Sequence, residues 1–147
     1  MVHKEVIQKM IKFSSENNFE KFLKNVKVIL ANNGKCSAEM KIENDHANSF
    51  GTLHGGLTAT LVDVISSYAL LTHPKFVQKL NTCPYGGVSV DIHISYLRSA
   101  KIGEEILIEA NTIKAGKTLA FLETVILNKN TKDILAKGSH TKFISTA

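Results

Sequence analysis

The stretch that decides the fold is residues 54–72, which read HGGLTATLVDVISSYALLT. From Leu57 to Thr72 the residues are almost uniformly apolar or small, which predicts a helix about 24 Å long at 1.5 Å per residue. A helix that is apolar nearly all round must be covered on most sides, so we expect it at the centre of the molecule. Pro74 is expected to end it.

The segments around this helix alternate between apolar and polar residues with the period of two that is typical of strands. Two such runs precede the helix and four follow it: 26–31, 36–42, 88–97, 105–113, 118–128 and 134–144. An Asn-Gly turn within residues 32–35 joins the first two runs as a hairpin. An amphipathic helix is predicted over residues 2–13, with a helical turn near residues 19–23.

An antiparallel sheet that curls around a single apolar helix buries that helix with short hairpin connections. The order of elements therefore predicts an α+β protein with the hotdog fold, in which the sheet wraps one long central helix and an N-terminal helix is added. Another α+β roll would give the same order. No repeat or linker divides the sequence, so we expect one domain over residues 1–147.

Composition argues against several classes of protein. The 147 residues are 44% hydrophobic and 21% charged, which disfavours a disordered chain. Asp63 interrupts the longest apolar stretch, so no membrane span is expected. The N-terminal residues lack the pattern of a signal peptide. We therefore expect an intracellular protein, cytoplasmic or mitochondrial, without integral membrane association.

Charge and cysteine content narrow the possible partners. The net charge of +5 comes from 18 basic and 13 acidic residues, and Arg98 is the only arginine. Readers of nucleic acid depend on the bidentate guanidinium group, so no nucleic-acid partner is expected. Scattered lysines better suit a small ligand that carries phosphates. Cys36 and Cys83 are expected to be reduced thiols, and because the cysteines and histidines lack metal-binding spacing, neither metal nor cofactor is expected.

Asp63 is the residue of the central helix that most needs an explanation. An ionised carboxylate among apolar neighbours is costly unless something solvates it. On a helical wheel, one small and polar stripe is formed by Gly56, Thr60, Asp63, Ser67 and Leu70. Asp63 could therefore serve a ligand lying along this stripe or a contact between subunits, and the pattern alone does not choose between them.

His54, Gly55 and Gly56 stand at the predicted start of the helix. Backbone N–H groups in a first turn have no intrahelical partner and lie at the positive end of the helix dipole. They could stabilise a thioester carbonyl oxygen as negative charge develops on it, and glycine would let the acyl carbon approach closely. Alternatively, the two glycines only permit a sharp turn into the helix.

The predicted strand 88–97 carries Ser89, Asp91, His93 and Ser95 on one polar face. These are the residue types of a hydrolase triad. However, residues two apart in a strand are about 6.6 Å apart and parallel, so they cannot form one triad within the strand. A solvated or interface face is the favoured explanation of Asp91 and His93.

The spacing of Asn48, His54-Gly55-Gly56 and Asp63 resembles that of the hotdog-fold thioesterase family. Residues 46–63 carry most of the resemblance, and 87–91, 116–121 and 140–142 are similar to the same family. The resemblance implies hydrolysis of medium- to long-chain fatty acyl-CoA to free fatty acid and CoA. It also implies a homotetramer built as a dimer of dimers.

The resemblance further implies roles for five residues. Asp63 would be the nucleophile or the general base that activates water. The Gly55 amide would form the oxyanion hole with the Asn48 side chain nearby, Ser89 would orient the water, and His54 would help to position the thioester. In this family one site combines two subunits, so Asp63 and Ser89 are expected to face Asn48 of the partner subunit and Gly55 of the partner subunit.

Contacts with coenzyme A are implied by the same resemblance. They come from one hairpin, from the strand 88–97 and from the end of the chain: Lys114, Ala115, Gly116, Lys117, Thr118, Leu119, Asp91, Tyr96, Lys142 and Phe143. The lysines among them could meet the pyrophosphate and the 3′-phosphate. Residues 72–87 form a longer connection than the family has, and they could cap an acyl tunnel or pack between subunits.

Two other functions remain open from the residues alone. A hydratase or dehydratase with the same fold would use His54 and Asp63 as an acid–base pair. A non-catalytic acyl-CoA-binding protein would bind the thioester without turning it over.

Overall fold

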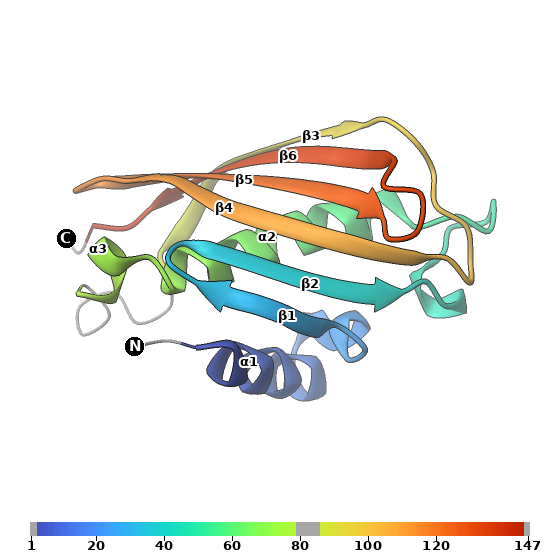
Figure 1. Cartoon of the computed structure of the whole chain (residues 1–147), viewed down its shortest axis with the longest axis horizontal. Helices are drawn as coiled ribbons and strands as arrows, with labels where there is room; N and C mark the ends of the chain where they lie inside the picture. The colour runs from blue at the N-terminus through green and yellow to red at the C-terminus, as the bar shows by residue number, and fades with distance from the viewer. Residues whose placement is uncertain (1–2, 79–85, 146–147) are drawn as a thin grey trace.

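Six antiparallel strands form one sheet in the order β1-β2-β4-β5-β6-β3 (Figure 1). The structure is a computed structural model that describes residues 3–78 and 86–145. The strands are β1 (Lys27–Asn32), β2 (Lys35–Lys41), β3 (Val88–Tyr96), β4 (Glu105–Ala115), β5 (Leu119–Asn128) and β6 (Ile134–Phe143). The helices are α1 (Lys4–Asn17), η1 (Phe19–Leu23), η2 (Asn44–His46), α2 (Gly55–Leu71) and α3 (Pro74–Val77).

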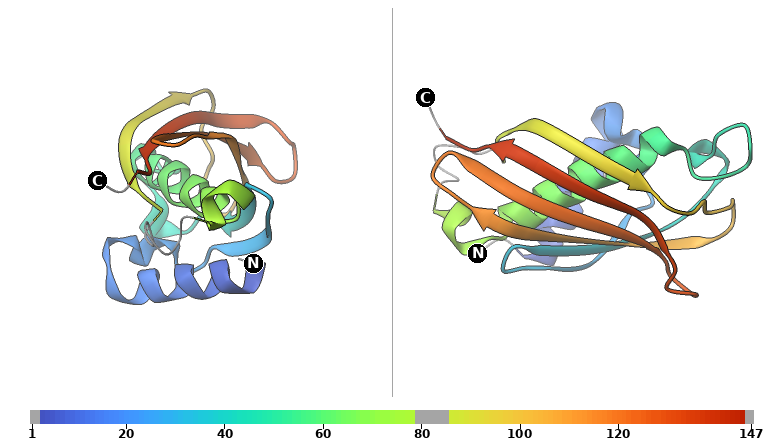
Figure 2. Two further views of the ribbon diagram at one scale, coloured as in Figure 1. Left: turned by 90° about the vertical axis from the view of Figure 1, so that its left-hand side faces the viewer. Right: turned by 90° about the horizontal axis from the view of Figure 1, so that it is seen from above.

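The sheet curls around α2, as the end-on view shows (Figure 2). Leu61, Ile65 and Leu70 of α2 are completely buried, and each such side chain contributes about 1.5–3 kcal/mol when it leaves water. Of the small and polar stripe on α2, Gly56, Thr60, Asp63 and Ser67 keep some exposure, whereas Leu70 does not. The predicted hotdog fold is therefore confirmed, with one partly polar stripe left open along its central helix.

Helix α1 protects the free edge of β1. Ile7 and Ile11 form the buried side of this helix. The Gln8 side chain forms hydrogen bonds with the backbone at the strand edge, as a neighbouring strand would. Its Nε2 donates to Val26 O at 3.0 Å, and its Oε1 accepts from Val28 N at 2.7 Å. Satisfying these edge groups prevents unwanted strand pairing there. The helix ends at Asn17, four residues beyond its predicted end. The prediction stopped at Phe13 because the residues that follow are polar and lack the apolar pattern of a helix.

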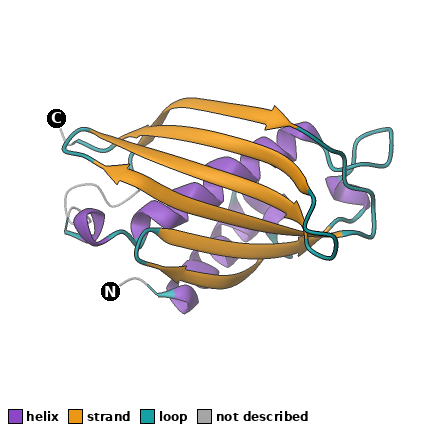
Figure 3. Ribbon diagram, turned by 45° about the horizontal axis from the view of Figure 1, so that its top comes forward, coloured by secondary structure: helices purple, strands orange, loops and turns teal. Residues whose placement is uncertain are grey.

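The opposite edge of the sheet is open. Among the described residues, β3 pairs with β6 alone, and it lies at the margin of the sheet (Figure 3). Val88 and Val90 are 64% and 60% exposed. A long edge strand with exposed apolar side chains is suited to pairing with another strand.

The predicted strand boundaries agree with the structure to within one or two residues. Asn33 and Gly34 have positive φ, as the predicted Asn-Gly hairpin requires. Pro74 does more than end α2, because α2 ends at Leu71 and Pro74 begins the short helix α3. The expected role of segment 72–87 lies partly outside the described residues. No helix in the described part of the chain is long and apolar enough to cross a membrane.

Candidate active site

A half-exposed carboxylate lies in the most apolar helix of the protein. The Asp63 side chain is 45% exposed, although the valines on either side of it are buried. It lines a cavity of about 390 Å³ bounded by α1, α2 and the start of β3. Ser67, Ser89 and Lys142 line the same cavity. The carboxylate is therefore open to a ligand and lies beside other polar groups.

His140 lies beside both Asp63 and Ser89. Its Nε2 lies 3.8 Å from an Asp63 carboxylate oxygen and 2.8 Å from the Ser89 hydroxyl. The pKa of His140 is lowered from 6.5 to about 4, chiefly because burial penalises the charged ring. The Asp63 carboxylate acts in the opposite direction and Lys142 in the same direction. The imidazole is therefore neutral at pH 7, with one nitrogen that donates and one that accepts.

A close approach between β6 and α2 brings His140 to its partners. A Cβ atom on Gly138 would collide with Val62 of α2, so the strand and helix meet there at backbone distance. Two residues along a strand and four along a helix both advance about 6 Å. The next meeting point is therefore His140 with Ser66, where Nδ1 and Oγ lie 2.7 Å apart.

A β-bulge aims Ser89 at this cluster. Ser89 pairs with Lys142 and Asp91 pairs with Thr141, so two steps along β3 match one step along β6. Such a bulge turns the residues before it to the opposite face. Ser89 consequently points inward to His140, whereas Asp91 is exposed on the outer face. The prediction that Ser89, Asp91, His93 and Ser95 share one face is therefore wrong.

Lys142 also turns inward. Its side chain is buried, and Nζ donates to Ser67 Oγ at 2.7 Å. Ser67 in turn donates to the Asp63 backbone carbonyl at 2.7 Å. Lys142 thus stabilises, through Ser67, the helix turn that carries Asp63. Its expected contact with a CoA phosphate stays a prediction that this buried position does not favour.

A second set of polar groups, from Asn48 and Gly55, lies at the start of α2, apart from the set formed by Asp63, Ser89 and His140. His54 caps the helix, because its Nδ1 accepts the Gly56 N–H at 2.8 Å. The Gly55 N–H has no hydrogen-bond acceptor among residues 3–78 and 86–145. One backbone donor at the positive end of the helix is therefore available to a ligand.

The Asn48 side chain supplies a second donor at this end. Its Oδ1 accepts from Phe50 N, Thr52 N and Thr52 Oγ1 at 3.0, 3.2 and 3.1 Å. These bonds orient the amide so that its NH₂ group remains to donate. Asn48 and Gly55 line one cavity of about 360 Å³. Two such donors suit a carbonyl oxygen that gains negative charge during a reaction.

The two polar groups lie apart within one chain. Gly55 and Asp63 are separated by eight helical residues, or about 12 Å along α2. Their cavities share no lining residue. The structure therefore brings Asp63 to Ser89 and Asn48 to Gly55, but it does not bring these two pairs together in a single chain. The His54 side chain lines a separate cavity with Gly56.

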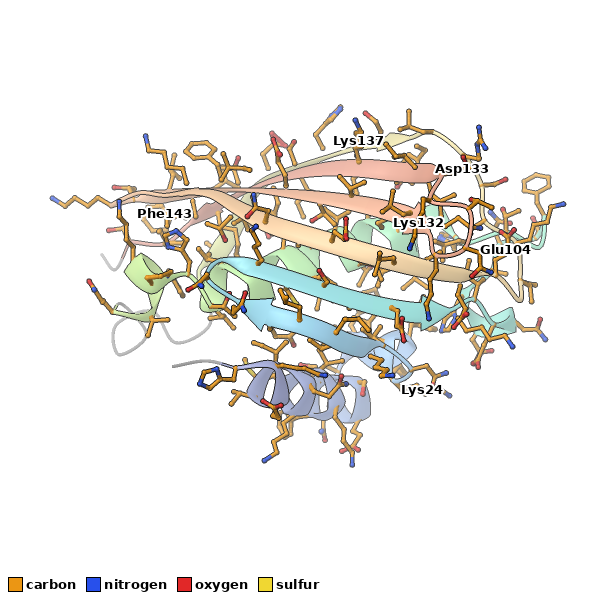
Figure 4. All side chains as sticks on the ribbon, in the orientation of Figure 1. Lys24, Glu104, Lys132, Asp133, Lys137 and Phe143 are labelled. Carbon is orange, nitrogen blue, oxygen red and sulfur yellow. The ribbon has the colours of Figure 1, made fainter. Side chains whose placement is uncertain are left out.

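Most of the predicted CoA contacts lie at one end of the sheet. Leu119, in the hairpin from Lys114 to Leu119, pairs with Phe143 of β6. Phe143 lies at the end of the molecule opposite Asp133 (Figure 4). The Lys114 and Lys117 side chains are exposed there. This end therefore carries exposed basic side chains together with two aromatic residues, Phe143 and Phe121, of which Phe121 pairs with Lys114.

Of the two predicted contacts on β3, Asp91 lies toward this end, because it pairs with Thr141, two residues before Phe143, whereas Tyr96 does not. Asp91 lies on the outer face of β3, and Tyr96 lies at the far end of the same strand, where it lines the Gly55 cavity. Because β-strands rise about 3.3 Å per residue, Tyr96 is about 23 Å from Ser89. The predicted nucleotide contacts thus fall in separate places of one chain.

Sequence reasoning gave no role to His140 or Ser66. A signal was present, because Gly138, His140 and Lys142 occupy alternate positions of the predicted strand 134–144. A histidine and a lysine on the buried face of a strand need polar partners. The pattern could not reveal that the partners are Ser66 and Ser89.

Comparisons with known proteins agree with this architecture. Residues 50–135 match the model of the thioesterase superfamily. Acyl-coenzyme A thioesterase 13 of Homo sapiens is 46% identical over 141 residues, covering 96% of this chain and 93% of that protein.

Two solved structures are similar along almost the whole chain. Thioesterase superfamily member 2 from zebra fish is 39% identical with a TM-score of 0.90, covering 99% of this chain and 100% of that one. The Mus musculus structure of the same name is 42% identical with a TM-score of 0.84, covering 97% of each chain. The chain therefore belongs to the thioesterase superfamily, a family of thioester hydrolases.

Proposed function

We propose that this chain hydrolyses medium- to long-chain fatty acyl-CoA to free fatty acid and CoA. The observation that carries the proposal is the meeting of Asp63, Ser89 and the neutral His140 beside one open cavity. The acyl-CoA substrate is supported by the name of the human relative, acyl-coenzyme A thioesterase 13.

Asp63 activates the attacking group in this proposal. As a general base it removes a proton from water while the water oxygen bonds to the thioester carbon. As a nucleophile its own oxygen bonds to that carbon, and water then hydrolyses the acyl-enzyme anhydride. In both routes the carbon–sulfur bond breaks, and CoA leaves as a thiolate that takes up a proton.

Ser89 and His140 hold the water in the general-base route. Ser66 donates to the Asp63 carbonyl at 3.2 Å, so His140 donates from Nδ1 to Ser66 and accepts the Ser89 hydroxyl proton at Nε2. The Ser89 oxygen then offers its lone pairs to a water molecule, and Asp63 accepts the second water proton. The water lone pair is left to face the thioester carbon.

The Gly55 N–H and the Asn48 NH₂ group polarise the thioester carbonyl. Neither donor has a hydrogen-bond acceptor in the described part of the chain, and both line the same cavity. Leu53, Ile126 and Leu135 give this cavity an apolar wall, which supports an apolar acyl group. His54 keeps the helix start in place through its cap on Gly56.

Each site combines two chains in this proposal. The open edge of β3 suits pairing with a second copy. In an antiparallel pair about a two-fold axis, the first half of one strand lies beside the second half of the other. This brings Ser89 and Asp63 toward Gly55 of the partner subunit. Two such dimers form the proposed homotetramer, and the hairpin from Lys114 to Leu119 contacts the CoA nucleotide with Phe143.

Thiol release from a series of acyl-CoA chain lengths tests the activity. Asp63→Asn is expected to lower kcat by about 10²–10⁴-fold, the usual contribution of a general base. Glu16→Gln is the matched control, because it makes the same carboxylate-to-amide change on the exposed side of α1. Binding of acyl-CoA without thiol release by the unaltered protein, or full activity in folded Asp63→Asn, would contradict the proposal.

A single turnover in H₂¹⁸O separates the two roles of Asp63. In the general-base route, the label enters the fatty acid directly. In the nucleophile route, water that attacks the Asp63 carbon of the anhydride leaves an Asp63 oxygen in the fatty acid and puts ¹⁸O into the carboxylate. Attack on the fatty-acyl carbon leaves Asp63 unlabelled, so ¹⁸O in Asp63 identifies the nucleophile route. Mass spectrometry of the peptide that contains Asp63 reads the difference.

A further inference from the structure

Tyr96 links the end of the edge strand to the start of the central helix. Its hydroxyl donates to the Gly55 carbonyl at 2.8 Å. Its ring atoms lie 3.4–3.5 Å from the point where a Cβ on Gly55 would stand. Pairing with Ala136 of β6 fixes the position of Tyr96 along the strand. The sheet edge therefore sets the place of the first residue of α2.

The peptide group between Gly55 and Gly56 is held from both sides. Tyr96 binds its carbonyl oxygen, and His54 Nδ1 accepts its N–H at 2.8 Å. A peptide group is planar, so fixing both ends of it fixes the direction of the Gly55 Cα. This restraint matters because two successive glycines otherwise have the widest choice of backbone angles.

The preceding peptide group, between His54 and Gly55, carries the N–H donor proposed for the oxyanion. The His54 carbonyl accepts the Thr58 N–H at 3.0 Å, whereas the N–H of the same peptide group, on Gly55, has no acceptor in the described residues. With the His54 carbonyl held by Thr58 and the next peptide group held by Tyr96 and His54, the direction of this N–H is restrained from both sides.

We infer that Tyr96 is a positioning residue for the oxyanion donor, and that it aims the Gly55 N–H by holding the Gly55 carbonyl. The inference rests on the proposed function. It differs from the nucleotide contact expected for Tyr96, because the hydroxyl acts on the enzyme backbone and leaves CoA affinity unchanged.

The same geometry makes β3 serve two sites. Ser89 belongs to the site of Asp63, whereas Tyr96, about 23 Å further along the strand, belongs to the site at Gly55. In the proposed dimer, these are two different active sites. The strand that pairs the subunits therefore positions the water in one site and the oxyanion donor in the other.

Tyr96→Phe tests the inference because it removes the hydroxyl and keeps the ring. We expect kcat to fall about tenfold, the scale of one lost hydrogen bond, with KM and inhibition by free CoA within about twofold of the unaltered protein. Ser95→Ala is the matched control. It deletes a hydroxyl from the neighbouring residue of β3, whose side chain is exposed, and it is expected to change none of these values.

Hydrogen exchange supplies a readout that needs no substrate. The amides of Gly55 and Gly56 are followed by mass spectrometry of the peptide spanning residues 53–58. Loss of the Tyr96 bond is expected to speed exchange of the Gly56 amide about tenfold, with the thermal midpoint of Tyr96→Phe close to that of Ser95→Ala.

Each other outcome overturns the inference. An unchanged kcat in Tyr96→Phe would show that the hydroxyl does not aim the donor. A raised KM or weaker CoA inhibition with unchanged kcat would assign Tyr96 to the nucleotide instead. An unaltered protein that releases no thiol would refute the proposed function itself, and the inference with it. Unchanged Gly56 exchange beside normal wild-type turnover would refute the inference alone.

Discussion

The two polar groups along α2 are built in different ways. The group at Gly55 comes from residues 48–58, which are neighbours in the chain and are held by a loop and a helix cap. The group at Asp63 combines α2 with β3 and β6, and its members Ser89 and His140 are distant in sequence. Local hydrogen bonding therefore prepares most of the donor end, to which β3 adds Tyr96, whereas tertiary packing prepares the whole surroundings of the carboxylate.

Of the two changes at the donor end, Asn48→Asp is expected to lower kcat more than Tyr96→Phe. The carboxylate oxygen can still accept from Phe50 and Thr52, so the loop keeps its shape. The NH₂ donor is lost and a negative charge replaces it, so kcat should fall about 10²–10³-fold, as when an oxyanion-hole donor is removed. Steady-state thiol release and thermal unfolding measure the two effects. Normal turnover in Asn48→Asp would remove Asn48 from the site.

Mixing two inactive variants tests whether the two ends meet between subunits. When unfolded Asp63→Asn and Asn48→Asp chains are refolded together, half of the dimers contain one chain of each kind. One of the two sites in each mixed dimer is then intact, so about a quarter of the unaltered activity should return. Refolding each variant alone is the control. If the mixture stays as inactive as its parts, each site lies within one chain.

The buried His140 predicts a loss of stability in acid. Its pKa is about 4 in the folded protein against 6.5 for an ordinary histidine, so between these values the unfolded chain binds a proton that the folded chain does not. Stability is therefore full above pH 6.5 and falls as the pH drops toward 4. Denaturant unfolding across this range measures the loss.

A pair of histidine variants isolates this contribution. His140→Gln should be less stable near pH 7, because its hydrogen bonds are altered, but its stability should fall less between pH 6.5 and 4. His93→Gln changes an exposed histidine of β3 and should keep the profile of the unaltered protein. Equal acid dependence in all three proteins would contradict a buried neutral His140.

Much of the fold could be predicted from local patterns. The apolar run from Leu57 gives the central helix, and the alternating runs give all six strands, because burial on one or both faces leaves a period in the sequence. The helical turn η2 and the short helix α3 were not predicted, since three or four residues leave no such period. The last turn of α1 was not predicted either, because its residues are polar and do not continue the apolar period.

The candidate site was predictable in part. Asp63 is conspicuous because a charge interrupts an apolar helix, and Gly55 because it belongs to a glycine pair at the start of that helix. The inward turn of Ser89 was not predictable, because the bulge that separates it from Asp91 is a property of the pairing with β6. Lys142 resembles a surface lysine by residue type, and only the structure reveals that it is buried against Ser67.

The sequence by itself determined the central helix, the strands and the lone carboxylate, because each follows from residues close together in the chain. The tertiary structure decided which polar groups meet. His140 reaches Asp63 and Ser89 only because Gly138 lets β6 lie against α2, and Tyr96 reaches Gly55 only because β3 ends beside the helix start. Hydrogen bonds act over about 3 Å, so contacts between distant segments depend on packing that no local pattern encodes.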